Sequence, residues 1–227
     1  MSSVKPAPSN SPSRLVANYD TYLFDMDGTV CDTFEVWLGI VQSTLGEYGI
    51  SAERKTIIRK VFGNSREGLV DLGVPESALL SIFASWDDAA QESMKYVGLY
   101  EGAEEFLYDL KSQGKKLALV TATVRRTVDI IIGANKLEDV FDVVICGDEM
   151  KEQKPSPEAL HRAMLLLDTS PGRTLMLGDS EKDLLAARNA NIDSLLFAPP
   201  EHKKFHDFRE LKSHAPKYII SSWRELL

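Results

Sequence analysis

The sequence predicts an α/β fold in which a doubly wound parallel sheet carries an inserted all-helical domain. Two observations lead to this prediction. Short apolar segments of strand length alternate with helical patterns over most of the 227 residues, and this alternation is typical of a parallel sheet with helices on both faces. Residues 32–98 break the alternation, because their apolar positions recur at helical spacing only.

The individual elements follow from apolar period and from glycine and proline positions. Strand-like runs occupy 19–27, 115–123, 141–147 and 173–179, and shorter ones lie at 194–197 and 217–220. Helices are expected at 124–134, 156–167, 181–190 and 223–227, and within the insert at 34–48, 52–62, around 66–72 and at 76–97. The sequence therefore divides into a flexible leader (1–18), a core domain (19–31 and 99–227) and a helical insert (32–98).

Composition narrows the class of protein. The chain has 26 basic and 34 acidic residues, a net charge of −8, which argues against a sequence-independent nucleic-acid partner. No run approaches the roughly 18 apolar residues of a membrane span, and the Ser- and Pro-rich leader lacks the apolar region of a secretory signal, although a targeting role stays open. With only Cys31 and Cys146, a reducing, cytoplasmic location is expected. The oligomeric state cannot be inferred.

Polar side chains stand at the ends of four predicted strands. They are Asp25 and Asp27, then Thr121, then Lys154 shortly after the third strand, then Asp179 with Ser180 and Asp183. Because ligands of such sheets bind at the carboxyl ends of the strands, we expect these groups to converge. Clustered carboxylates repel one another, and an all-oxygen set suits a hard cation such as Mg²⁺. A cation beside a lysine would form a pocket for a phosphoryl group.

Four segments carry a family resemblance: FDMDGTV at 24–30, LVT at 119–121, KPSPE at 154–158 and GDSEKD at 178–183. In order and separation they resemble the four motifs of the haloacid dehalogenase (HAD) superfamily, in the branch of phosphoglycolate phosphatases and β-phosphoglucomutases. The resemblance covers residue 20 to the C-terminus. It implies a Rossmann-like core with a helical cap domain after the first strand, which here is the helical insert.

The resemblance also implies roles for individual residues. Asp25 would be the nucleophile that forms an aspartyl-phosphate, and Asp27 would protonate the leaving oxygen and then deprotonate water. Phosphoryl oxygens would be held by Thr121, Ala122 and Lys154. Mg²⁺ would be held by Asp25, Asp27 and Asp179, supported by Ser180 and by Asp183, which would act through water or by orienting Lys154. The implied function is a Mg²⁺-dependent phosphatase of a small phosphorylated metabolite. A phosphomutase of the β-phosphoglucomutase type and, less favoured, a non-catalytic binding module are the alternatives.

Outside these motifs the pattern is less specific. The segment GNSR at 63–66 is similar to the cap loop of β-phosphoglucomutases, so Arg66 is a candidate for substrate binding, or else a solvated residue. The apolar stripe that contains Trp37 is interpreted as packing within the insert. His202, His206 and His214 match no familiar zinc spacing, and a solvated basic loop is expected there.

Overall fold

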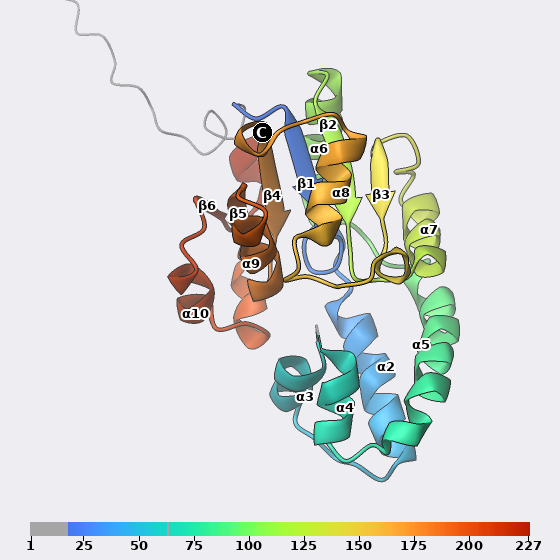
Figure 1. Cartoon of the computed structure of the whole chain (residues 1–227). Helices are drawn as coiled ribbons and strands as arrows, with labels where there is room; N and C mark the ends of the chain where they lie inside the picture. The colour runs from blue at the N-terminus through green and yellow to red at the C-terminus, as the bar shows by residue number, and fades with distance from the viewer. Residues whose placement is uncertain (1–17, 63) are drawn as a thin grey trace, which may run out of the picture.

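A computed structural model describes residues 18–62 and 64–227 (Figure 1). Its centre is a six-stranded sheet in the order β3-β2-β1-β4-β5-β6, in which every neighbouring pair of strands is parallel. The strands are β1 (Thr21–Phe24), β2 (Lys116–Val120), β3 (Val143–Ile145), β4 (Thr174–Gly178), β5 (Asp193–Phe197) and β6 (Tyr218–Ile220). The predicted α/β fold class is confirmed.

Helices cover both faces of the sheet, and β1 shows why its sequence is apolar throughout. Successive side chains of a strand point to opposite faces. Leu23 belongs to the apolar cluster that includes Leu160 and Ala187, whereas Phe24 packs with Phe106 and Trp223. These partners come from α8 (Glu158–Leu166) and α9 (Glu181–Asn189) on one face and from α6 (Ala103–Ser112) and the C-terminal turn on the other. Helix α7 (Arg125–Ala134) follows β2.

The register of the strands sets the position of the site. Phe24, the last residue of β1, pairs with Leu119 of β2 and with Leu177 of β4. The chain therefore leaves all three strands at one edge of the sheet, within one or two residues of Asp25, Thr121 and Asp179. The prediction that these strand ends converge follows directly from this register.

The helical insert lies beyond that edge, below the sheet in Figure 1. It consists of α2 (Phe34–Glu47), α3 (Arg54–Val61), α4 (Ser65–Asp71) and α5 (Leu79–Met94). The expected helix 76–97 begins instead with a 3₁₀ turn over Glu76–Ala78, and Gly63 lies outside the described residues. Inside the insert, Trp86 Nε1 of α5 donates to Thr44 Oγ1 of α2 over 2.7 Å. The domain boundaries proposed from the sequence remain a prediction.

Two segments differ from expectation. Residues 202–214 are not a solvated loop, because they contain a 3₁₀ turn (Pro200–Lys204) and α10 (Phe208–Ser213). His202 is completely buried, since it lies among the rings of Phe34, Phe197 and Phe205. The expected C-terminal helix is only a 3₁₀ turn, Trp223–Leu226, anchored by stacking of Trp223 on Phe197 at 4.9 Å.

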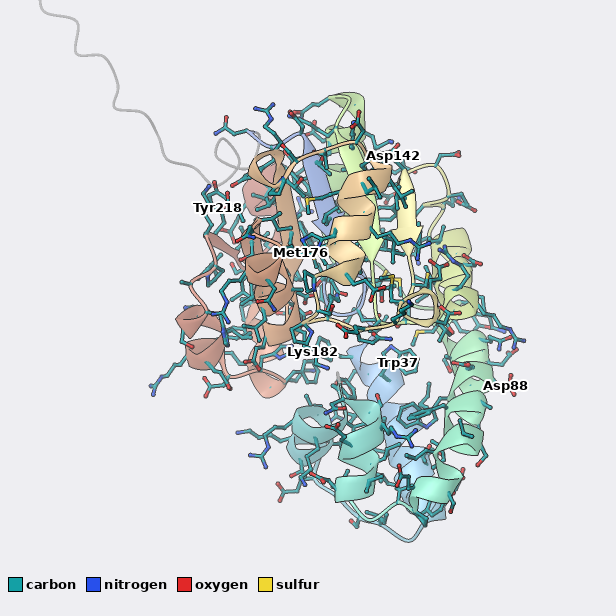
Figure 2. All side chains as sticks on the ribbon, in the orientation of Figure 1. Trp37, Asp88, Asp142, Met176, Lys182 and Tyr218 are labelled. Atoms are coloured by element: carbon teal, nitrogen blue, oxygen red, sulfur yellow. The ribbon has the colours of Figure 1, made fainter. Side chains whose placement is uncertain are left out.

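Asp142, labelled in Figure 2, directly precedes β3, the outermost strand of the sheet on this side. Its carboxylate accepts hydrogen bonds from Lys111 Nζ at 2.7 Å and from the backbone amide of Leu117 at 2.8 Å. Burial alone would raise the pKa of Asp142, but these two bonds lower it below its usual value. Across the described part of the chain, no helix has the length and apolarity needed to cross a membrane.

Candidate active site

Lys154 joins two buried carboxylates at the centre of the site. Its Nζ lies 2.6 Å from Asp25 Oδ1 and 2.6 Å from Asp183 Oδ1, and it also donates to the carbonyl of Val120 at 3.1 Å. All three side chains are less than a tenth exposed. An ammonium group has three protons, so every donor of Lys154 has an acceptor. Asp183 was expected to act through water or by orienting Lys154, and its 2.6 Å contact with Lys154 gives the second role a direct geometric basis.

Electrostatic effects at this cluster are strong because water is excluded. Burial raises the pKa of Asp25 well above its usual value, the charge on Asp183 adds to this, and Lys154 opposes it. Burial alone would lower the pKa of Lys154, but Asp183 and Asp25 raise it above its ordinary value. Lys154 therefore stays protonated, and the carboxylates beside it remain only partly compensated.

Asp179 completes the buried group of acids from the end of β4. Its Oδ1 accepts a hydrogen bond from Thr29 Oγ1 at 3.3 Å, and its Oδ2 lies 3.0 Å from His206 Nε2. Burial by itself would raise the pKa of Asp179, but the hydrogen bond and charge of His206 lower it. Gly28 allows this approach: its φ is +75°, and a β-carbon there would lie 2.6 Å from Asp179 Oδ2.

Asp27 occupies the other side of the site, facing the helical insert. Its Oδ1 accepts from the indole Nε1 of Trp37 at 2.9 Å, and its Oδ2 accepts from Thr121 Oγ1 at 3.1 Å and Thr123 Oγ1 at 2.8 Å. Trp37 lies on α2, so this bond links the insert to the core; Figure 2 shows Trp37 between the two. Trp37 packs against the apolar core, as interpreted from the sequence, and its indole also holds a polar group of the site.

The donor set fits a divalent cation. Asp25, Asp179 and Asp183 each bring a carboxylate oxygen to within 4.8 Å of the other two, and of the described lysines and arginines only Lys154 forms an ion pair with them. Both oxygens of Asp183 are already bonded, one to Lys154 and the other to Ser180. Asp25 and Asp179 are therefore the side chains best placed to bind an ion, and oxygen ligands of this kind suit Mg²⁺.

The other residues expected in the site are Ser180, Ala122 and Arg66. Ser180 donates to Asp183 Oδ2 at 2.6 Å as part of a capping box that begins α9, so Asp183 also serves the helix N-terminus. Ala122 lies exposed after β2. Arg66 lies on α4, more than half exposed, and its guanidinium pairs with Glu76 at 2.8 Å. Among the described residues Arg66 has no hydrogen bond or ion pair with the core site.

The sequence did not indicate Lys182 of α9. Figure 2 shows this residue on the side of the core that faces the helical insert. It is half-buried, and burial together with the charge of Lys154 lowers its pKa, while carboxylates that include Glu67 of α4 oppose this. The pKa of Lys182 is therefore influenced by the helical insert as well as by the core. Its position inside the fourth motif was the only available signal.

Comparison with known proteins settles the family. Residues 22–197 match the model of the haloacid dehalogenase-like hydrolases. The chain belongs to this family. A curated relative named pyrophosphatase PpaX, from Bacillus cereus (strain G9842), is 32% identical over 209 residues, which are 92% of this chain and 94% of the relative. The HAD-like assignment confirms the predicted family and enzyme class: this is a hydrolase of the phosphatase type.

Solved structures of the HAD superfamily share the fold. A putative phosphoglycolate phosphatase from Lactobacillus plantarum has a TM-score of 0.81 at 20% identity and covers 92% of this chain and 98% of that chain. A putative β-phosphoglucomutase from Thermotoga maritima has a TM-score of 0.70 at 24% identity, with coverages of 91% and 96%. At these identities the likeness concerns the fold, and the substrate is a separate question.

Proposed function

We propose that this HAD-like hydrolase cleaves a phosphate ester of a small metabolite with Asp25 as nucleophile and Mg²⁺ as cofactor. The supporting observation is the contact of Lys154 with Asp25 Oδ1 at 2.6 Å. It fixes the carboxylate at the strand end and leaves Oδ2 with only a 3.5 Å contact from Thr29. The held carboxylate is thereby oriented for attack on phosphorus.

The reaction takes two displacements. Asp25 attacks phosphorus, the bond from phosphorus to the ester oxygen breaks, and Asp27 gives the leaving oxygen its proton. Asp27 then removes a proton from water, whose oxygen attacks phosphorus and releases phosphate from Asp25. Mg²⁺, held by Asp25, Asp179 and the Asp27 backbone carbonyl, would neutralise charge on the phosphoryl oxygens.

The hydroxyls near Asp27 have a second use in this scheme. Thr121, which donates to Asp27 in this structure, would turn to the phosphoryl oxygens together with the Ala122 amide when substrate enters. Trp37 and Thr123 would keep Asp27 oriented meanwhile. Because Trp37 belongs to the helical insert, the acid–base group would be fully positioned only when the insert is seated on the core.

The part of the substrate outside the phosphoryl group would be bound between the core domain and the helical insert. Lys182 offers a half-buried cation at that boundary, which suits an anionic metabolite with a second phosphate or a carboxylate. Arg66 remains a candidate for the same task. We expect the protein to act on free metabolites in the cytoplasm, without a nucleic-acid or membrane partner.

The proposal is tested with a panel of phosphate monoesters and diphosphates, following both phosphate release and sugar-phosphate isomerisation in Mg²⁺. We expect phosphate release that Asp25→Asn abolishes, with Asp139→Asn, an exposed carboxylate, as the matched control. Intact-mass measurement after acid quench should detect phosphate on the wild type but not on Asp25→Asn. Isomerisation without net phosphate release would establish a mutase instead, and more than a few per cent activity in Asp25→Asn would refute the nucleophile.

A further inference from the structure

Two histidines that follow β5 approach the same carboxylate oxygen of Asp179. His206 Nε2 lies 3.0 Å and His202 Nδ1 lies 3.6 Å from Asp179 Oδ2. Asp179 and His202 are almost completely buried, and the His206 side chain is 19% exposed. The mechanism proposed above uses neither histidine.

The hydrogen bonds of His202 leave one ring nitrogen without a proton. Tyr100 donates its hydroxyl proton to Asp32 at 3.2 Å, and the same oxygen lies 2.8 Å from His202 Nε2. Since that hydroxyl has no second proton, Nε2 donates to the hydroxyl oxygen when Asp32 accepts the hydroxyl proton, and Nδ1 carries a lone pair in this tautomer. This buried Nδ1 has no hydrogen-bond partner among the described residues. Two acceptors, Nδ1 and Asp179 Oδ2, thus face each other away from water, an arrangement that a cation stabilises.

The two histidine nitrogens also lie at metal-site spacing from Asp179 Oδ2. Bonds of 2.0–2.1 Å in a tetrahedral zinc site put neighbouring ligand atoms about 3.3 Å apart. The two observed distances to Asp179 Oδ2 lie on either side of that value, and the two histidine nitrogens are within 4.8 Å of each other. Tyr100 would then act as the outer partner that fixes the orientation of a ligating imidazole.

We propose that Asp179, His202 and His206 form a second metal site, which takes a transition-metal ion of the zinc class. Two imidazoles and one carboxylate favour such ions, whereas Mg²⁺ prefers oxygen ligands alone. The two sites share Asp179 through different oxygens: Oδ2 faces the histidines, while Oδ1 lies on the side of Thr29. Zinc therefore adds to the Mg²⁺ proposed for the oxygen cluster and is bound by a different set of ligands.

The test is direct metal binding by the full-length protein. Metal-stripped protein is dialysed against Zn²⁺ with Mg²⁺ in large excess, and bound zinc is counted by elemental analysis. We expect one zinc ion per chain, with affinity falling about a hundred-fold or more in His206→Gln. His161→Gln, an exposed histidine on α8, should bind like the wild type. Co²⁺ should give the intense visible absorption of a low-coordinate nitrogen-ligated ion in the wild type and in His161→Gln, but not in His206→Gln.

The outcomes separate this proposal from the phosphatase mechanism. If no zinc is retained over Mg²⁺, or if His206→Gln binds it as tightly as the wild type, the site is refuted. His206 would then form only a hydrogen bond with Asp179, or zinc would occupy the aspartates alone. Asp25→Asn should keep the zinc while losing phosphatase activity, so the two proposals fail independently. His206 is partly exposed, and Zn²⁺-dependent thermal stabilisation of the wild type checks that folded protein binds the ion.

Discussion

Replacing Lys154 by methionine is the sharpest test of the charge balance in this site. The change keeps most of the side-chain length but removes the ammonium group. It leaves the carboxylates of Asp25 and Asp183 and the carbonyl of Val120 without the donor that now lies between them. All these groups are shielded from water, so solvent cannot replace the lost bonds.

The expected cost is large on the scale of protein stability. Breaking a buried ion pair by removing one partner costs about 3–5 kcal/mol, against a total free energy of unfolding of about 5–15 kcal/mol. Burial and the neighbouring acids already raise the pKa of Asp25, and loss of Lys154 raises it further. The folded state then binds protons more tightly than the unfolded chain, so the deficit should shrink as the pH falls from 8 toward 5.

Urea unfolding followed by circular dichroism measures this directly. Lys154→Met should lose about 3–5 kcal/mol at neutral pH, while Lys151→Met, an exposed lysine in the same segment, should stay within about 0.5 kcal/mol of the wild type. Adding Asp183→Asn removes one stranded charge and should recover part of the loss. A loss below about 1 kcal/mol, or strictly additive effects in the double variant, would show that this reasoning overstates the buried charge.

Three further outcomes are expected. Trp37→Phe removes the donor to Asp27 and should slow hydrolysis of an ordinary ester about ten-fold, the worth of a bond to a charged group, but affect a nitrophenyl ester less; equal losses on both would refute the link to acid catalysis. Asp142→Asn should cost under about 1 kcal/mol at pH 7, because the carboxylate is partly solvated. The cost should be smaller at pH 3, since the stabilisation from a lowered pKa is complete only above the unfolded pKa of about 3.9 and is lost progressively as the pH falls toward the folded pKa; urea unfolding at both pH values decides. Lys182→Met should slow hydrolysis of a bisphosphate substrate ten-fold or more relative to hydrolysis of a small monoester. Arg66→Ala should have the same effect only if the helical insert binds the same group of the substrate.

The parts of the fold that depend on local pattern could be predicted. The buried strands are short apolar runs that end in glycine or acidic residues, so their positions and parallel arrangement follow from period and alternation. Asn191 after α9 adopts a φ of 55°, as its position at the end of the predicted helix suggests. The break before α5 and the shortness of the C-terminal turn were missed, because a 3₁₀ turn and an α-helix have similar residue preferences and their ends depend on packing.

The candidate site also has a part that could be predicted from the sequence and a part that could not. Asp25 and Asp179 directly follow their strands, and Lys154 follows β3 after a 3₁₀ turn. Their meeting is therefore predicted by the rule that the carboxyl ends of parallel strands share one end of the sheet. His206 reaches Asp179 only because the segment after β5 folds back over the strand end, with Phe205 stacked on Phe34 at 4.2 Å. That packing depends on an aromatic ring more than 170 positions earlier in the chain, and no short motif records it. The groups proposed to perform the chemistry could therefore be predicted from their positions in the sequence, whereas Trp37 and the two histidines near Asp179 required the assembled structure.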